Sequence, residues 1–316
     1  MPILEVDRLV KRFGNVTAVD EVSFEVQPGE LFGLLGPNGA GKTTTLASIA
    51  GLLRPDGGRI VVDGHPVDRE LLEAQRVLGV VPQEIALYED LSAGENLRFF
   101  GRLKGLGGAE LARRAREVLE LVGLLDHARQ RVSSFSGGMK RRLNMAVGLI
   151  GGPKLLLLDE PTVGVDPQSR RHILDSVAEL ARQGMAVLYT SHYMEEVEYL
   201  CRRIAIVDHG RVIAQGPLEQ VRALAGEAPV IRVRLEGALP EAKVAELRSR
   251  FDGQLSLDDR ELRILLSQGS ARVGETISWL EALGLPMEGL RLETPDLETV
   301  FLALTGRELR DGGGEG

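Results

Sequence analysis

One short stretch of the sequence has the residue types and spacing needed to hold a phosphate chain. It reads Gly36-Pro37-Asn38-Gly39-Ala40-Gly41-Lys42-Thr43, fits the pattern G-x-x-x-x-G-K-[ST], and is followed by Thr44. Glycines let backbone N–H groups close around phosphate oxygens, Lys42 can reach the β- and γ-phosphates, and Thr43 can ligate Mg²⁺. Because an apolar run precedes it and a helical pattern follows it, the stretch predicts a nucleoside triphosphate site.

A pair of carboxylates follows a second apolar run. Leu155 to Leu158 predicts a buried strand, and Asp159 and Glu160 come directly after it. Ligands of α/β sheets bind at the carboxyl ends of the strands, so these side chains are expected at that edge. There Asp159 would hold Mg²⁺ through water, and Glu160 could polarise the attacking water. Taken alone, the pair is equally typical of a helix start.

A third stretch places small residues at a helix start. Ser136-Gly137-Gly138 precedes a helical pattern and leaves bare N–H groups at its beginning, which favours anion binding. One triphosphate does not need two such sites in one chain, so we interpret this one as meeting the γ-phosphate bound to another subunit. The basic run from Lys140 to Arg142 is interpreted as a solvated helix face.

Together these stretches resemble the ATPase subunit of an ABC transporter, over roughly Ile3 to Val221. The signature of that family is usually written L-S-G-G-Q, and here Phe135 replaces the leucine and Met139 the glutamine. Because methionine lacks a side-chain amide, no nucleotide contact is assigned to Met139. The resemblance implies a P-loop NTPase cassette that forms a homodimer around two ATP molecules. Each site would combine Gly36–Thr44 of one chain with Ser136–Gly138 of the other.

The resemblance implies roles for four further residues. Gln83 would sense Mg²⁺ and the partner membrane domain, and His192 would contact the γ-phosphate. Asp166 would cross the dimer, and Phe13 would stack on adenine where the family usually has tyrosine. Judged without the family, His192 is a structural histidine and Gln83 an exposed loop amide. Asp166 would then be a turn residue before proline, and Phe13 a core aromatic.

The cofactors that the resemblance implies are ATP and Mg²⁺. Water would attack in line, and the charge on the γ-phosphate would spread onto Lys42, Mg²⁺, His192 and the opposite helix end. Glu160 would order or deprotonate that water. The implied metal-binding residues are Thr43, Gln83 and Asp159.

Apolar runs that alternate with amphipathic stretches predict an α/β fold for residues 1–222. The expected elements of its core are strands at Leu31–Leu35, Lys154–Leu158 and Ala186–Thr190 and a helix at Lys42–Leu52. Alternation in Ile3–Val6 and Val22–Val26 predicts an antiparallel β subdomain, and a helical subdomain is expected at about residues 84–150. A mixed sheet core with these two subdomains is the ABC cassette that the resemblance implies.

The rest of the chain has a different character. Residues 223–316 hold 17 acidic and 11 basic residues, against 29 and 27 in residues 1–222. A strand-helix-strand-strand-helix-strand order with a final helix predicts a small α+β accessory domain at residues 223–310. That order is typical of a ferredoxin-like domain. The glycine-rich residues 311–316 are expected to be a disordered tail.

Composition limits the class of protein. The 316 residues are 43% hydrophobic and include no stretch of about 18 apolar residues, so no membrane-spanning segment is expected. The first residues, Met1 to Asp7, lack a basic segment followed by an apolar one, so no secretory signal is expected. A single cysteine, Cys201, suits a reducing cytosol. Acidic residues outnumber basic ones by 46 to 38, which argues against nucleic acid binding. We expect a cytoplasmic protein held at the inner face of the cell membrane by separate transmembrane permease subunits.

The resemblance favours export as the function. Ser136–Arg142 and Asp296–Arg307 resemble segments of the daunorubicin-resistance type of drug-exporter ATPase. The second segment is equally typical of an amphipathic helix that docks on its own domain. The surface from Ile85 to Phe100 is the candidate contact for the membrane subunits, or an ordinary helical surface. The alternative functions are the ATPase of an importer or of a lipid, polysaccharide or sodium exporter, and a soluble non-transport ABC ATPase.

Overall fold

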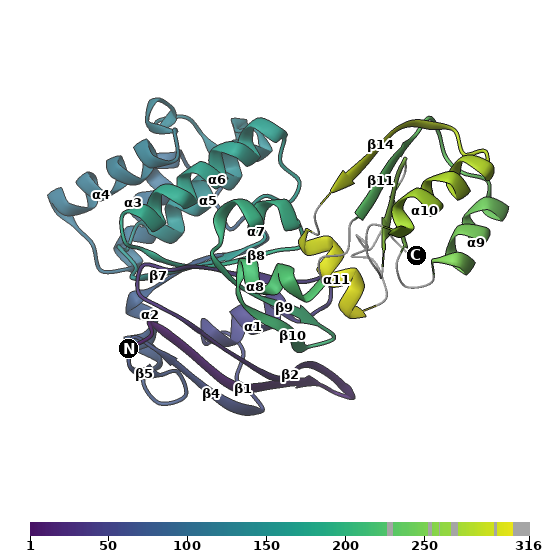
Figure 1. The fold of residues 1–316 in the computed structure, drawn as a ribbon. Helices are drawn as coiled ribbons and strands as arrows, with labels where there is room; N and C mark the ends of the chain where they lie inside the picture. Colours follow the sequence, from purple (N-terminus) through teal and green to yellow (C-terminus); the bar gives the residue numbers. More distant parts are fainter. Residues whose placement is uncertain (226–229, 252–254, 259, 267–270, 294–295, 306–316) are drawn as a thin grey trace. The chain divides into compact units, whose positions relative to one another are not determined.

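The computed structural model describes residues 1–225, 230–251, 255–258, 260–266, 271–293 and 296–305 (Figure 1). The chain divides into two compact units, Met1–Val212 and Ile213–Gly316. The expected tail at residues 311–316 lies outside the described residues. Among the helices described, none has the length and apolar character needed to cross a bilayer.

A six-stranded sheet forms the core of the first unit, whose last two residues, Arg211 and Val212, begin the edge strand β10. Its strand order is β10-β9-β3-β8-β7-β6. The strands are β3 (Leu31–Leu35), β6 (Leu78–Val81), β7 (Leu155–Asp159), β8 (Ala186–Ser191), β9 (Arg203–Asp208) and β10 (Arg211–Pro217). The pairs β9-β3, β3-β8, β8-β7 and β7-β6 are parallel, and Asp159 lies opposite Thr190 in the β7-β8 register. All four leucines of β7 are fully buried, which explains the unbroken apolar run.

The antiparallel subdomain expected near the N-terminus is present. Its strand order is β2-β1-β4-β5, with β1 at Leu4–Phe13, β2 at Val16–Val26, β4 at Gly57–Val62 and β5 at His65–Pro66. Alternate residues of β1 and β2 are buried in one apolar core with residues of β3 and β7. The two sheets therefore share a core, and the period-2 pattern of β1 and β2 marks the face that each turns toward it.

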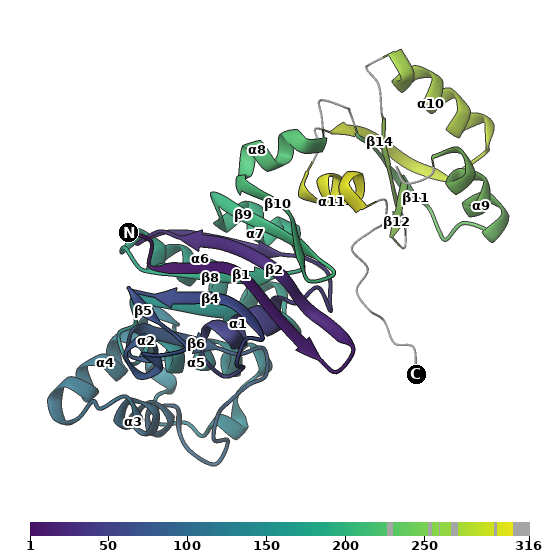
Figure 2. The same ribbon diagram turned by 90° about the horizontal axis from the view of Figure 1, so that it is seen from below.

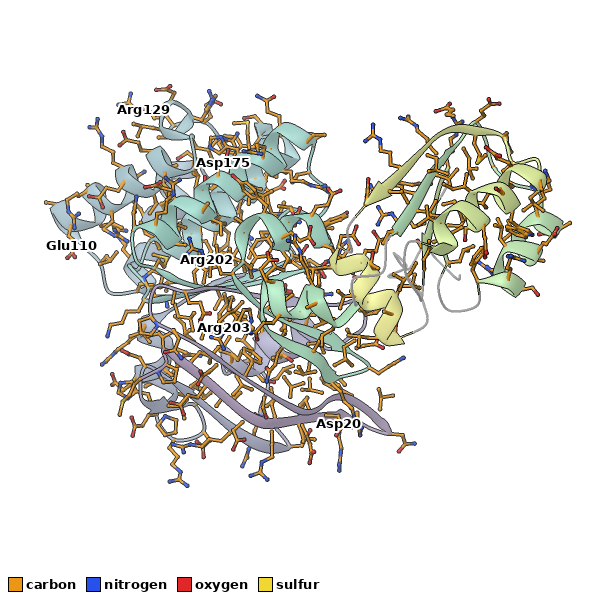
Figure 3. All side chains as sticks on the ribbon, in the orientation of Figure 1. Asp20, Glu110, Arg129, Asp175, Arg202 and Arg203 are labelled. Carbon is orange, nitrogen blue, oxygen red and sulfur yellow. The ribbon has the colours of Figure 1, made fainter. Side chains whose placement is uncertain are left out.

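Helices complete the first unit (Figure 2). They are α1 (Lys42–Ile49), α2 (Leu71–Val77), α3 (Ala93–Leu103), α4 (Gly108–Leu121), α5 (Gly137–Leu149), α6 (Pro167–Arg182) and α7 (Met194–Leu200), with 3-10 turns at Leu125–His127 and Val132–Ser134. α1 ends before the expected Leu52 because Gly51 adopts a φ of 71°, a left-handed geometry that terminates helices. α3, α4 and α5 pack together as a helical layer. Charged side chains such as Glu110 and Arg129 lie on its exterior (Figure 3).

The second unit contains a separate antiparallel sheet of order β12-β13-β11-β14. Its elements are α8 (Leu218–Arg222), a 3-10 turn (Ala223–Ala225), β11 (Val230–Leu235), α9 (Glu241–Arg250), β12 (Leu255–Asp258), β13 (Glu261–Leu265), α10 (Ala271–Ala282), β14 (Met287–Glu293) and α11 (Leu297–Thr305). The order β-α-β-β-α-β and this strand arrangement agree with the ferredoxin-like expectation. Within this unit, which extends from Ile213, α8 and the turn after it contact α11.

Candidate functional site

The glycine-rich loop between β3 and α1 is shaped so that two of its positions accept only glycine. A Cβ on Gly36 would lie 2.2 Å from the carbonyl oxygen of Val207. A Cβ on Gly41 would lie 2.4 Å from the carbonyl oxygen of Ala18, and Gly41 also has a φ of 101°. No side chain caps the start of α1. Its first N–H groups are therefore available to an anion, as the sequence pattern predicts.

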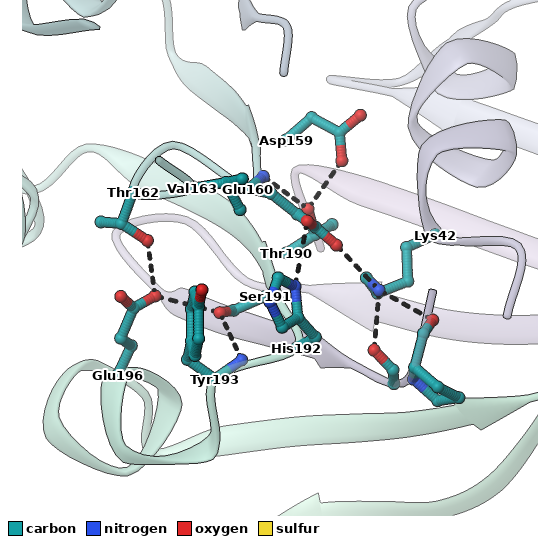
Figure 4. Close-up of polar contacts among 12 residues, drawn as sticks. Lys42, Asp159, Glu160, Thr162, Val163, Thr190, Ser191, His192, Tyr193 and Glu196 are labelled. Carbon is teal, nitrogen blue, oxygen red and sulfur yellow. Dashed lines mark hydrogen bonds and ion pairs between the residues drawn. The ribbon is translucent and has the colours of Figure 1, made fainter. Parts of the chain in front are cut away.

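Lys42 is held inside this loop. Its side chain is buried, and Nζ donates hydrogen bonds to the carbonyl oxygens of Gly36 at 2.7 Å and Pro37 at 3.0 Å. Nζ also forms an ion pair with Oε1 of Glu160 at 2.9 Å (Figure 4). An ammonium group has three donors, and these three partners can use all of them. A phosphate chain must therefore displace at least one of these partners to reach Lys42.

Glu160 lies between two of the predicted catalytic residues. Its Oε2 is 3.0 Å from Nδ1 of His192, while Oε1 contacts Lys42. Burial by itself would raise the pKa of Glu160, but the hydrogen bond from His192 and the charge of Lys42 outweigh it and lower the pKa to about 2. The carboxylate is thus ionised at neutral pH, and Nδ1 of His192 must be the donor.

The backbone of Glu160 is strained. Its φ is 45°, in the left-handed region that non-glycine residues seldom occupy. The Glu160 N–H group donates to Oγ1 of Thr190 at 3.0 Å, which helps to fix this conformation. A strained residue held by a buried hydrogen bond at the end of a strand is a common feature of reacting sites.

Asp159 is buried beside the phosphate loop. Its Oδ1 accepts a hydrogen bond from Oγ1 of Thr190 at 2.8 Å. Burial raises the pKa of Asp159, and hydrogen bonds from the hydroxyl groups of Thr190 and Thr43 counteract it in part. Sequence reasoning missed Thr190. The parallel register that sets Asp159 opposite Thr190 is the signal that could have identified it, because that register follows from aligning the two apolar strands.

The Ser-Gly-Gly stretch begins α5 as predicted. Oγ of Ser136 accepts a hydrogen bond from the N–H of Met139 at 3.3 Å and caps the helix. A Cβ on Gly138 would lie 2.0 Å from Oγ of Ser169 and 3.2 Å from Oδ2 of Asp166. The starts of α5 and α6 therefore lie side by side. In the part of the chain that the structure describes, no hydrogen bond or ion pair joins Ser136 to the Lys42 group.

Asp166 and Phe13 are both exposed. Oδ1 of Asp166 accepts the N–H of Ser169 at 2.9 Å and caps α6, so Asp166 is more than a turn residue. Phe13 ends β1 and is 48% exposed, with Nζ of Lys11 5.5 Å from its ring centroid. The core-aromatic interpretation is therefore wrong for Phe13, and its ring is accessible for stacking.

The interpretation of Lys140 to Arg142 as a solvated face is wrong. Arg141 is only 8% exposed, and its guanidinium donates to the main-chain carbonyls of Gln83 and Val163. It thereby fastens the loop after β6 to the loop after β7. Arg142 also donates to a carbonyl, that of Val122 at 2.9 Å. Helical spacing contained the signal, since Arg141 is three residues from Gly138 and shares its buried face.

Gln83 is held through its backbone. Its carbonyl accepts from Arg141, and the neighbouring Pro82 carbonyl accepts from the side-chain amide of Asn144 at 3.3 Å. The Gln83 side chain itself is exposed. The loop is therefore anchored to α5 while its amide group remains accessible to a ligand.

The full length of the chain is similar to known ATP-binding proteins, and the ABC transporter family pattern matches residues 19–163. Linearmycin resistance ATP-binding protein LnrL of Bacillus subtilis (strain 168) is 45% identical, over 98% of this chain and 100% of that protein. Daunorubicin resistance ATP-binding protein DrrA3 of Streptomyces coeruleorubidus is 40% identical, over 97% of each chain. Nod factor export ATP-binding protein I of Cupriavidus metallidurans is 41% identical, over 98% of this chain and 99% of that protein.

Solved structures are similar over 68% to 78% of the chain. A structure described as the ATP binding subunit of an ABC transporter is 31% identical with a TM-score of 0.65, covering 78% of this chain and 99% of that one. CbiO1 from Clostridium perfringens, described as part of the ABC transporter complex cbiONQ, is 28% identical with a TM-score of 0.65. The match covers 70% of this chain and 91% of that one. A dimeric post-hydrolysis ATP-binding cassette bound to ADP and Pi is 26% identical with a TM-score of 0.62, over 68% and 98%.

Proposed function

Because this chain belongs to the ABC transporter family of ATP-binding proteins, we propose that it hydrolyses ATP to drive the export of a drug-like molecule through separate membrane subunits. The observation that carries the hydrolysis is the junction of Lys42, Glu160 and His192 at the end of the phosphate loop. Resistance relatives that align with nearly the whole chain support export of an antibiotic-type substrate.

In this proposal each side chain at the junction has a separate task. When ATP binds, its phosphates replace Glu160 as the ion-pair partner of Lys42. The ammonium group then neutralises phosphate charge, and the Glu160 carboxylate becomes available to water. A carboxylate with a pKa as low as that of Glu160 is a weak proton acceptor, so it acts first by accepting a hydrogen bond from the attacking water and orienting it. His192, fixed through Nδ1, stabilises the charge that develops on the γ-phosphate.

The residues around Asp159 fit a magnesium ion. Mg²⁺ prefers oxygen ligands and is usually bound by one or two carboxylates together with substrate phosphates. The Asp159 carboxylate is directed to the hydroxyl of Thr43, and Gln83 offers an accessible amide oxygen. We assign the ion to Thr43, Asp159 and Gln83. When bound, it would neutralise charge on the β- and γ-phosphates.

A homodimer would complete each ATP site. The start of α5 is electropositive, and its Ser136, Gly137 and Gly138 lie beside Asp166. In the proposed dimer these residues meet the γ-phosphate held by the other chain. Support comes from the dimeric arrangement of the similar cassette bound to ADP and Pi.

The loop and helix after Gln83 are the proposed contact for the membrane subunits. Tyr88, Phe99 and Phe100 form a cluster there, with ring centroids 4.9 to 6.0 Å apart. Tyr88 is 49% exposed and Phe99 39% exposed, which is typical of aromatic side chains at protein interfaces. Such a contact would place the protein at the cytoplasmic face of the membrane. Since Arg141 joins Gln83 to α5, movement of this surface would be passed to α5 and to Ser136 at its start.

A second candidate substrate is a Nod factor. A relative named for Nod factor export is 41% identical and the daunorubicin resistance relative is 40% identical, so similarity does not separate these two. The test uses inverted membrane vesicles that contain this chain together with a candidate membrane subunit. We expect ATP-dependent accumulation of daunorubicin in these vesicles and none with Lys42→Ala. ATP hydrolysis without drug accumulation would exclude the drug-export part of the proposal.

A further inference from the structure

A buried carboxylate near the site is used by none of the steps above. Glu196 lies in α7 and is 3% exposed. Three hydroxyl groups donate to its Oε2. Tyr189 donates at 2.8 Å, and Thr162 at 2.9 Å and Ser191 at 3.0 Å are the two donors seen in Figure 4. A buried charge needs this many partners, because it has left water and must be compensated. The arrangement is therefore a specific binding site for one carboxylate oxygen.

The other oxygen of Glu196 faces a cation. Its Oε1 is 3.4 Å from Nε of Arg170, and the Arg170 guanidinium lies 4.4 Å from the ring centroid of Tyr193. Arg170 belongs to the first turn of α6, and its N–H donates to the carbonyl of Asp166 at 2.9 Å. The Glu196 carboxylate is thus connected to the helix end that Asp166 caps.

Two partners of Glu196 lie close in sequence to residues of the ATP site. Thr162 follows Glu160 by two residues, and Ser191 directly precedes His192. Oγ of Ser191 also accepts the N–H of Tyr193 at 2.9 Å, which closes a tight turn around His192. One buried side chain therefore joins the segments that carry the water-orienting carboxylate, the histidine and the start of α6.

We propose that Glu196 is a positioning residue that fixes the positions of Glu160 and His192 relative to each other and to the start of α6. The inference rests on the proposed hydrolysis at Glu160. Glu196 touches no reacting atom, so its effect is on geometry: it fixes the backbone on both sides of the Glu160–His192 hydrogen bond. Displacement of a catalytic group by about 1 Å can lower a rate about 100-fold.

The test compares Glu196→Gln with the adjacent exposed control Glu195→Gln. Glutamine keeps the shape and one acceptor oxygen but removes the charge that faces Arg170. We measure kcat and KM for ATP hydrolysis, ATP affinity by calorimetry and the melting temperature. For Glu196→Gln, kcat falls about 10- to 100-fold while KM and ATP affinity stay within about twofold. Glu195→Gln keeps wild-type values.

Two results would overturn the inference. A Glu196→Gln protein with wild-type kcat and a lowered melting temperature shows that the carboxylate only stabilises the fold. If Glu196→Gln does not fold, Ser191→Ala removes one of the three donors to Oε2, and unchanged kcat in that variant also excludes the positioning role. Failure of the wild-type protein to hydrolyse ATP would instead contradict the proposed function, and with it the step that Glu196 serves.

Discussion

The ion pair between Lys42 and Glu160 leads to a prediction with two opposite effects. Glu160 is bound to Lys42 and His192, and its pKa is lowered from 4.5 to about 2. Replacing it by Gln removes that interaction. We therefore expect Glu160→Gln to unfold more easily without nucleotide, and also to bind nucleotide more tightly, because phosphate no longer competes with the carboxylate for Lys42.

The magnitude follows from the pKa. The pKa of Glu160 is lower by about 2.5 in the folded protein than its ordinary value of 4.5. At 1.36 kcal/mol per pKa unit, this difference corresponds to about 3 kcal/mol of unfolding free energy as an upper value. Because the folded pKa is the lower one, this stabilisation is complete above pH 4.5 and is lost as pH falls toward 2. The stability difference between wild type and variant should therefore be about 0.8 kcal/mol smaller at pH 4 than at pH 7.

Urea unfolding at pH 7 and pH 4, followed by far-UV circular dichroism, measures the first effect. Calorimetry with ADP measures the second, because ADP reaches Lys42 through its β-phosphate and lacks the γ-phosphate that would close a dimer. We expect ADP affinity to rise about tenfold in Glu160→Gln, which corresponds to about 1.4 kcal/mol of removed competition. Glu195→Gln, which changes an exposed carboxylate, serves as the control in both assays.

If wild type and Glu160→Gln have equal unfolding free energies at pH 7 and equal ADP affinities, this reasoning is refuted, because the ion pair then does not form in solution. With ATP the same variant should bind nucleotide, lose hydrolysis and accumulate as an ATP-bound dimer on size-exclusion chromatography. Wild-type phosphate release from Glu160→Gln would remove Glu160 from the mechanism.

Three further substitutions test separate parts of the site. Lys42→Ala should weaken ATP binding about 10- to 100-fold by calorimetry and abolish phosphate release, and unchanged affinity would show that the loop is not used as proposed. Phe13→Ala should weaken ATP binding by about 1–3 kcal/mol, whereas Phe13→Tyr should keep wild-type affinity. Unchanged ATP affinity in Phe13→Ala would show that the ring makes no contact with adenine. Arg141→Met should lower the melting temperature and reduce transport more than ATP binding, since it removes the hydrogen bond between Gln83 and α5 and leaves only Asn144 to hold the loop. Transport coupled to hydrolysis as in the wild type would contradict that role.

The residues of the site that were predictable from sequence are those whose chemistry depends on immediate neighbours. Gly36 and Gly41 are recognisable because a local backbone path requires glycine, and Lys42 has a fixed place after them. Asp159 and Glu160 follow the apolar run Leu155 to Leu158, which predicts a buried strand and is fully buried in the structure. Local spacing was enough to place all of these at one edge of the sheet.

The residues that sequence analysis missed depend on distant partners. Arg141 and the Gln83 carbonyl are 58 residues apart, and Glu196 and Thr162 are 34 residues apart. Arginine and glutamate are common on exposed helix faces, so residue type alone favours a solvated interpretation. Burial of these charges is decided by which loops pack around α5 and α7. That packing follows from the sheet order, which the sequence pattern does not specify.

The neighbouring starts of α5 and α6 carry chemically different caps. Asp166 sets a carboxylate on the start of α6, and the hydrogen bond from the Ser169 backbone keeps its pKa low, so that end is already neutralised. Ser136 satisfies one N–H group of α5 with an uncharged hydroxyl, and the residual positive potential survives. An incoming anion thus meets one electropositive and one neutralised helix end almost side by side. Ser136→Asp would preserve the helix yet neutralise both ends.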